Sequence, residues 1–274
     1  MNAWLETIAV VLVAASGITL GRRFSSFRRP CWTLGYIIPL IFVALLVTPR
    51  CAGSLAFVPP FYWLIGRARF VVLGLAVTMG LTTPLSRLPR RCERIMICIL
   101  MAVVVTWFSV LPFFVPVLIK GRLLNLRTSV DSDGVCLQTT GYTCAPAAAV
   151  TALRKLGLPA QEGEIAVLSH SSPLTGTLPK CLYTALLNRY TTKGLKCQYR
   201  YFNSLAELGD TGITLAVVRD TFLTDHCVAV LDVSGGMVTV ADPISGKISI
   251  PHRQFEKIWR FSGIVLKRDS VQSI

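Results

Sequence analysis

A cysteine and a glutamine in the second half of the chain have the spacing of a nucleophile and its oxyanion donor. Gln138 lies six residues before Cys144, and Cys144 lies at the start of an alanine-rich run, 143–156, that is predicted to be a helix. The unpaired amides at a helix N-terminus and the helix dipole favour a thiolate over a thiol. The backbone N–H of Cys144 and the side-chain amide of Gln138 could then hold the oxyanion that forms when a thiolate attacks a carbonyl carbon.

A histidine and an aspartate further along could complete this chemistry. A thiol nucleophile needs a base for its proton and a third group to orient that base. His226 begins an apolar strand-like run, 226–233, and Asp242 follows the next one, 237–241. The glycine turn at 234–236 predicts a hairpin of these two strands. We therefore expect the Asp242 carboxylate to lie near Nδ1–H of His226.

Each of these four residues also has an ordinary structural interpretation. A buried cysteine is usually a small hydrophobic residue, Gln138 alone would be a surface side chain, and His226 alone would be a strand-end histidine. Asp242 before a proline is a good turn opener. Other residues of the same types are expected on the surface (His170, His252), as competitors of Asp242 (Asp225, Asp232) or in the core (Cys136, Cys227).

The elements that must position these residues predict an α+β domain. After Arg127 the sequence changes from long apolar runs to a polar, turn-rich composition, and residues 128–274 are expected to form this domain. Helices first and an antiparallel sheet afterwards is an α+β order. The helices are expected at 143–156, 162–169, 179–190 and 251–259, and the strands at 197–202, 213–219, 226–233, 237–241, 248–250 and 261–266.

The first half of the chain is different in composition. The mean hydropathy of the 274 residues is +0.58 and only 15% are charged, which is too apolar for an ordinary soluble domain. Residues 1–127 hold 14 Lys/Arg against two acids, whereas residues 128–274 hold 14 against 12. Arginines between apolar runs are typical of loops that flank membrane spans. A basic, aromatic-rich surface for nucleic acid is not found, so we expect no nucleic-acid partner.

Four apolar runs in this half have about the length of a membrane span. They predict an all-α transmembrane region over 1–127, and the first is interpreted as an uncleaved span because no basic segment or cleavage pattern accompanies it. A shorter run, 55–65, contains Pro59-Pro60 and is expected to be interfacial or re-entrant, with a fifth span as the alternative. The four runs are 4–20, 31–47, 70–85 and 95–119.

The basic loops suggest an orientation in the bilayer. Loops 21–30 and 86–94 carry four arginines each, and with four spans both lie on one side, the cytoplasm. The second half would then lie outside, anchored in what we expect to be a bacterial inner membrane. A fifth span would place it inside instead.

The cysteines do not suggest a metal site. The nine cysteines show no repeated spacing, no C-x-x-C and no paired histidines. Neither a zinc site nor a disulfide framework is expected, and no cofactor is indicated.

The segments "CAPAA", "DHCVAVLDV" and "VTVADPISGKISIPHRQFEKIW" together resemble the papain-like peptidase family that processes bacteriocin precursors at double-glycine leaders. The resemblance covers about residues 128–274. It implies Gln138 as oxyanion donor, Cys144 as nucleophile, His226 as general base and acid, and Asp242 as the residue that orients His226. Many members of this family are fused to ATP-driven exporters, but this sequence has no G-x-x-x-x-G-K-[ST] loop, so an exporter would be a separate partner.

These observations predict a membrane-anchored cysteine endopeptidase that cleaves a peptide or protein substrate. Two alternatives use the same fold. One is a non-catalytic module that binds a peptide, against which the presence of all four residues argues. The other is an acyl or amide transferase that uses the same thiol.

Overall fold

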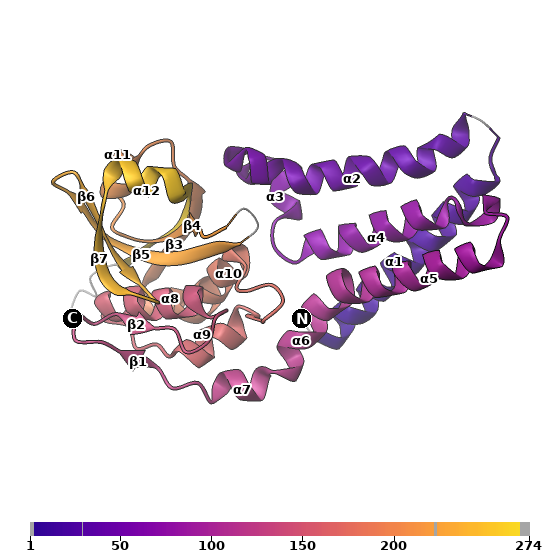
Figure 1. Ribbon diagram of the computed structural model, residues 1–274. Coiled ribbons are helices and arrows are strands. Elements are labelled where there is room, and N and C mark those ends of the chain that lie inside the picture. The colour runs from indigo at the N-terminus through magenta and orange to yellow at the C-terminus, as the bar shows by residue number, and fades with distance from the viewer. Residues whose placement is uncertain (1–2, 29, 222–223, 269–274) are drawn as a thin grey trace. The chain divides into compact units, whose positions relative to one another are not determined.

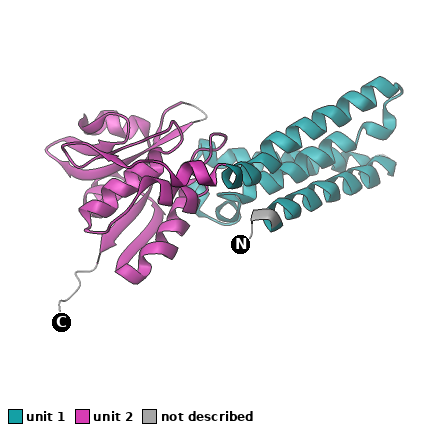
Figure 2. Ribbon diagram, turned by 90° about the horizontal axis from the view of Figure 1, so that it is seen from below, with its two compact units in different colours: residues 1–118 teal, residues 119–274 magenta. Residues whose placement is uncertain are grey.

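The computed structural model describes residues 3–28, 30–221 and 224–268, which form two compact units. The units are Met1–Leu118 and Ile119–Ile274 (Figure 2). The division lies earlier than the boundary expected between residues 127 and 128. A short helix, α7 (Lys120–Leu124), belongs to the second unit. It packs on α9 (Glu162–Leu168) so closely that a Cβ atom on Gly163 would collide with the Leu123 carbonyl oxygen.

The first unit is all-helical and agrees with the prediction of four spans. Four of its described segments are long and apolar enough to cross a membrane: Leu5–Ser26, Cys31–Cys51, Ala68–Arg87 and Arg91–Leu118. The run at 55–65 forms only short helical segments, η2 (Gly53–Phe57) and α3 (Phe61–Leu64), and is not among them. The other helices are α1 (Ala3–Ser26), η1 (Cys31–Thr33), α2 (Leu34–Cys51), α4 (Ala68–Thr82), η3 (Leu85–Arg87), α5 (Arg91–Val105), η4 (Thr106–Val110) and α6 (Leu111–Leu118).

Small residues allow the helices of this unit to approach one another closely. Gly17 and Gly21 of α1 face α4, where an added Cβ atom would collide with the Thr78 hydroxyl or lie 2.7 Å from the Met79 carbonyl oxygen. Between α2 and α4, the Thr83 hydroxyl donates to the Gly35 carbonyl over 3.2 Å. Glycines and hydroxyls at helix contacts are typical of membrane bundles, where large apolar side chains face lipid.

The second unit has the predicted α+β fold. Its main sheet has six strands in the order β3-β8-β4-β5-β6-β7, and every neighbouring pair is antiparallel. The strands are β3 (Leu195–Tyr201), β4 (Ile213–Arg219), β5 (Asp225–Ser234), β6 (Met237–Asp242), β7 (Gly246–Pro251) and β8 (Trp259–Arg268); a separate hairpin joins β1 (Ser129–Val130) and β2 (Cys136–Leu137). The helices are α7, α8 (Cys144–Lys155), α9, α10 (Pro179–Tyr190), η5 (Thr191–Lys193), α11 (Leu205–Gly209) and α12 (His252–Ile258).

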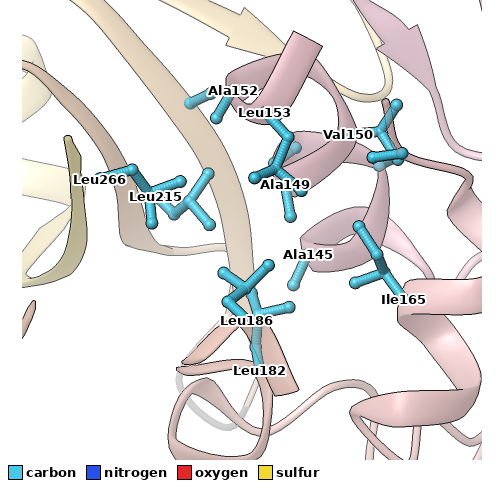
Figure 3. Packing of buried hydrophobic residues seen from close by; sticks show 14 of the residues in the cluster. Ala145, Ala149, Val150, Ala152, Leu153, Ile165, Leu182, Leu186, Leu215 and Leu266 are labelled. Carbon is cyan, nitrogen blue, oxygen red and sulfur yellow. The ribbon is translucent and has the colours of Figure 1, made fainter. Parts of the chain in front are cut away.

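The helices cover both faces of this sheet (Figure 1). On one face α8 packs over the central strands β4 and β5 and α10 packs over the edge strand β3, and on the other face lie α11 and α12. Figure 3 shows how Ala149 and Leu153 of α8 meet Leu215 of β4 and Leu266 of β8 in the first of these cores. The alanines let α8 lie close to the sheet, and this contact places the start of α8, with Cys144, beside the strands that carry His226 and Asp242.

Candidate active site

Cys144 is the first residue of α8, and the side chain of the N-cap residue, Thr143, makes no capping hydrogen bond. The preceding residue, Thr143, is turned back: its hydroxyl donates to the Thr140 carbonyl over 3.0 Å and accepts from the Thr140 amide over 3.2 Å. Pro146 in the first turn has no N–H. Thr143 thus leaves the N–H groups of Cys144 and Ala145 uncapped, so that they can interact with an anion at the helix start.

His226 and Asp242 lie together on the neighbouring strands β5 and β6. The register of this pair matches Ala229 with Ala241, which brings the first residues of β5 near the last residue of β6. Nε2 of His226 lies 2.7 Å from Oδ1 of Asp242. The expectation that Asp242 would meet Nδ1 is wrong. Because Asp242 takes Nε2, Nδ1 is the ring nitrogen that remains for a second partner, and Cys144 is near enough to the ring to raise its pKa.

The charge of His226 is set by these two partners. Burial of the ring disfavours the imidazolium, but the hydrogen bonds to Asp242 and Cys144 outweigh it and raise the pKa of His226 to about 9. For Asp242, burial opposes ionisation, yet hydrogen bonds from His226 and the Ile244 amide lower the pKa of the carboxyl. The Ile244 amide donates to Oδ1 over 3.0 Å. Each partner therefore favours the charged form of the other, the imidazolium of His226 and the carboxylate of Asp242.

Gln138 is tied to the turn that follows Asp242. Its backbone N–H donates to the Pro243 carbonyl over 2.9 Å. The side-chain Oε1 is buried and has no hydrogen-bond partner in the part of the chain that the structure describes. Such atoms are uncommon in folded proteins. Gln138 is thus hydrogen-bonded to the turn after Asp242 through its backbone, and the chain continues from it to the start of α8 six residues later.

The competing residues lie in other environments. Burial raises the pKa of Cys136 and of Cys197 to about 12, and it also raises the pKa of Cys227, so these three remain thiols. Asp225 forms an ion pair with Arg260 at 2.9 Å. His252 contacts the Met237 carbonyl at 3.2 Å. Within the described residues no group of three or more His, Cys, Asp or Glu side chains could hold a metal ion.

Glu162, which was not predicted as a site residue, contacts the segment around Gln138. Its carboxylate is fully buried and accepts two hydrogen bonds from Thr139, the residue next to Gln138. In the sequence nothing distinguishes it from Glu164, two residues later, which forms an ion pair with Arg189.

Comparisons with known proteins return relatives of about half of the chain. No family profile matches it. An uncharacterized protein of Methanothermobacter marburgensis is 26% identical over 148 residues, which are 54% of this chain and 98% of the relative.

Solved structures of similar fold include peptidases. A double glycine motif protease from an AMS/PCAT transporter, in complex with its leader peptide, is similar over 52% of this chain and 93% of its own, with a TM-score of 0.42 and 16% identity. For the peptidase domain of Streptococcus ComA the shares are 48% and 96%, again with a TM-score of 0.42 and 16% identity.

Proposed function

We propose that this chain is a membrane-anchored cysteine peptidase with Cys144 as its nucleophile. The observation that carries the proposal is the His226 ring: its Nε2 lies 2.7 Å from Oδ1 of Asp242, and Cys144, at the start of α8, is among the groups that raise the pKa of His226. An imidazolium beside a cysteine stabilises the thiolate that attacks a carbonyl. A carboxylate on the far ring nitrogen fixes the orientation of the imidazole and favours its charged form.

The reaction follows from these contacts. The Cys144 thiolate attacks the carbonyl carbon of the scissile bond, and the carbonyl oxygen takes up the electron pair. The Cys144 N–H and the Gln138 amide donate to this oxyanion. When the C–N bond breaks, His226 gives its proton to the leaving amine, and a thioester on Cys144 remains. Water then attacks the thioester and loses its proton to His226. The C–S bond breaks, which restores thiolate and imidazolium.

We propose a peptide as substrate, because one similar structure is a double glycine motif protease with its leader peptide. We also propose that the second unit lies outside the cytoplasm. This proposal is supported by the charge pattern: if all four candidate segments span the membrane, the arginine-rich loops 21–30 and 86–94 would lie together on the cytoplasmic side and the second unit on the opposite side. Reporter fusions after residue 127 test this: a reporter active only outside the cytoplasm should be active, and activity of a cytoplasmic reporter would reverse the orientation.

The test of the function uses the full chain in detergent with a library of internally quenched peptides. Wild type should cleave members of the library, and Cys144→Ala should lose activity by about 10³-fold or more. Cys51→Ala, the same change at an exposed cysteine of the first unit, is the matched control and should cleave as wild type does. Equal cleavage by Cys144→Ala and wild type would refute the proposal.

A further inference from the structure

A buried carboxylate lies beside the candidate oxyanion donor and has no part in the mechanism above. Glu162 is the first residue of α9 and is 0% exposed. Its Oε1 accepts from the Thr139 backbone N–H over 2.9 Å, and its Oε2 accepts from the Thr139 hydroxyl over 2.6 Å. The carboxylate therefore accepts hydrogen bonds from both the backbone and the side chain of Thr139, the residue that follows Gln138.

Burying this charge is costly, which calls for a reason. The desolvation penalty of a buried carboxylate amounts to several kcal/mol and is offset only by well-formed hydrogen bonds. Two hydrogen bonds to a charged acceptor are of the strong kind. The negative charge is felt nearby, because after burial it is the next cause that raises the pKa of Cys136 to about 12.

Glu162 itself is held in place by two contacts. Its backbone N–H donates to the Thr128 hydroxyl over 3.0 Å. The next residue, Gly163, lies against the Leu123 carbonyl of α7, where any side chain would collide. These contacts fix the backbone at the start of α9, and so they limit where the Glu162 carboxylate can lie.

The segment around Gln138 is anchored on three elements. The Cys136 N–H donates to the Thr151 hydroxyl of α8 over 2.8 Å, and the Gln138 N–H donates to the Pro243 carbonyl over 2.9 Å. Glu162 supplies the third anchor, from α9. Gln138 is therefore fixed on both sides: its own N–H is hydrogen-bonded to the Pro243 carbonyl, and the next residue, Thr139, donates two hydrogen bonds to Glu162.

We propose that Glu162 is a positioning residue that fixes the Gln138 amide where the oxyanion forms. The inference rests on the proposed function, since it gives Glu162 a task only if Gln138 donates to an oxyanion. Donors of this kind act because they are already in place before charge develops, so small displacements reduce their effect. Glu162 would act through Gln138 and contact no substrate.

Two small probes separate this role from a general effect on folding. Acylation of Cys144 by p-nitrophenyl acetate passes through a tetrahedral oxyanion, whereas alkylation of the same sulfur by iodoacetamide does not. Both rates are measured on the full chain in detergent, acylation as the nitrophenolate burst above that of Cys144→Ala, and alkylation by mass spectrometry of the Cys144 peptide. The variant is Glu162→Gln, and the control is Glu164→Gln, an exchange of the neighbouring acid on the same helix.

We expect Glu162→Gln to slow acylation about tenfold, a fraction of the loss of a whole oxyanion donor, and to change alkylation less than about twofold. Glu164→Gln should change neither rate. Introduced into Gln138→Ala, the Glu162→Gln exchange should have no further effect, because residues that act as a unit are not additive. Thr139→Val keeps the backbone bond to Glu162 but loses the hydroxyl contacts with Glu162 and with the Arg127 carbonyl. It should slow acylation about threefold, whereas Thr139→Ser, which keeps a hydroxyl, should acylate at the wild-type rate.

Several results would overturn the proposal. An equal loss of both rates in Glu162→Gln would mean a structural role. Unchanged acylation in Glu162→Gln and Thr139→Val, or an undiminished effect in Gln138→Ala, would also contradict it. If Glu162→Gln does not fold, the Thr139 pair decides alone. Failure of the proposed function looks different: wild type itself would show no burst above Cys144→Ala, and the inference would fall with it.

Discussion

The two units of this protein use apolar residues in opposite ways. In the first unit large side chains such as Leu12, Leu40 and Met96 are more than 60% exposed, while the helix contacts are made by small residues. In the second unit Leu153 and Phe255 are fully buried. The first pattern suits a solvent as apolar as leucine, where close packing holds helices together. The second suits water, where burial of apolar surface is the main driving force.

The two units also differ in the surroundings of their ion pairs. The first unit contains an ion pair, Glu6 with Arg67 at 2.6 Å, that links two helical segments. In the second unit the half-buried pair of His226 and Asp242 adjoins a cysteine at a helix start. The difference is the one that the proposed function requires, with anchoring in the first unit and chemistry in the second.

The largest effect is expected when the two units are separated. A fragment of residues 119–274 should appear in the aqueous fraction and retain Cys144-dependent cleavage, because its core is closed within itself. Residues 1–118 alone should remain with membranes. Fractionation and the quenched-peptide assay measure both, and a 119–274 fragment that is found only in membranes would break the comparison.

Replacing a leucine by alanine should change the free energy of unfolding far more in the second unit than in the first. Leu153→Ala leaves a cavity between α8 and the sheet and should lower the free energy of unfolding by about 2–5 kcal/mol. Leu40→Ala, at a site that is 66% exposed, should change it by less than about 0.5 kcal/mol. Thermal unfolding of the detergent-solubilised chain measures both; equal losses would show that the first unit does not present Leu40 to lipid.

Enlarging a small residue should affect the first unit alone. Gly21→Leu must displace α4, since a Cβ atom would already lie 2.7 Å from the Met79 carbonyl, and overpacking of this kind costs about 1–3 kcal/mol. The alkylation rate of Cys144 should stay the same. A variant with unchanged unfolding would mean that α1 and α4 do not pack at Gly21.

The smallest effect concerns the proton of His226. Its pKa of about 9 means that the imidazolium is present below this pH and lost above it, so cleavage should fall as the pH rises through about 9. Asp242→Asn removes the carboxylate that favours the charged ring. The alkaline limb should then move to lower pH by about one unit or more. A limb that stays in place would show that Asp242 does not support this charge.

The sequence carries the pattern of elements better than the direction of side chains. Four apolar runs gave four segments able to span a membrane, and the 234–236 turn correctly joined the strands of His226 and Asp242. The ring nitrogen that meets Asp242 was predicted wrongly, because it depends on a rotation that strand pairing leaves open. Glu162 and Glu164 are both acids near a helix start, and only tertiary packing buries the first.

If Cys144 is the nucleophile, it forms a thioester with the substrate in every turnover. In the most direct test, the full chain is mixed with an intact library peptide that it is known to cleave. The reaction is quenched in acid within the first turnover, and the mass of the proteolytic fragment that contains Cys144 is determined. We predict that Cys144 carries the N-terminal half of the peptide, that hydroxylamine removes it, and that Cys51 carries none. Cleavage that proceeds without any adduct on Cys144, and equally in Cys144→Ala, would contradict the account.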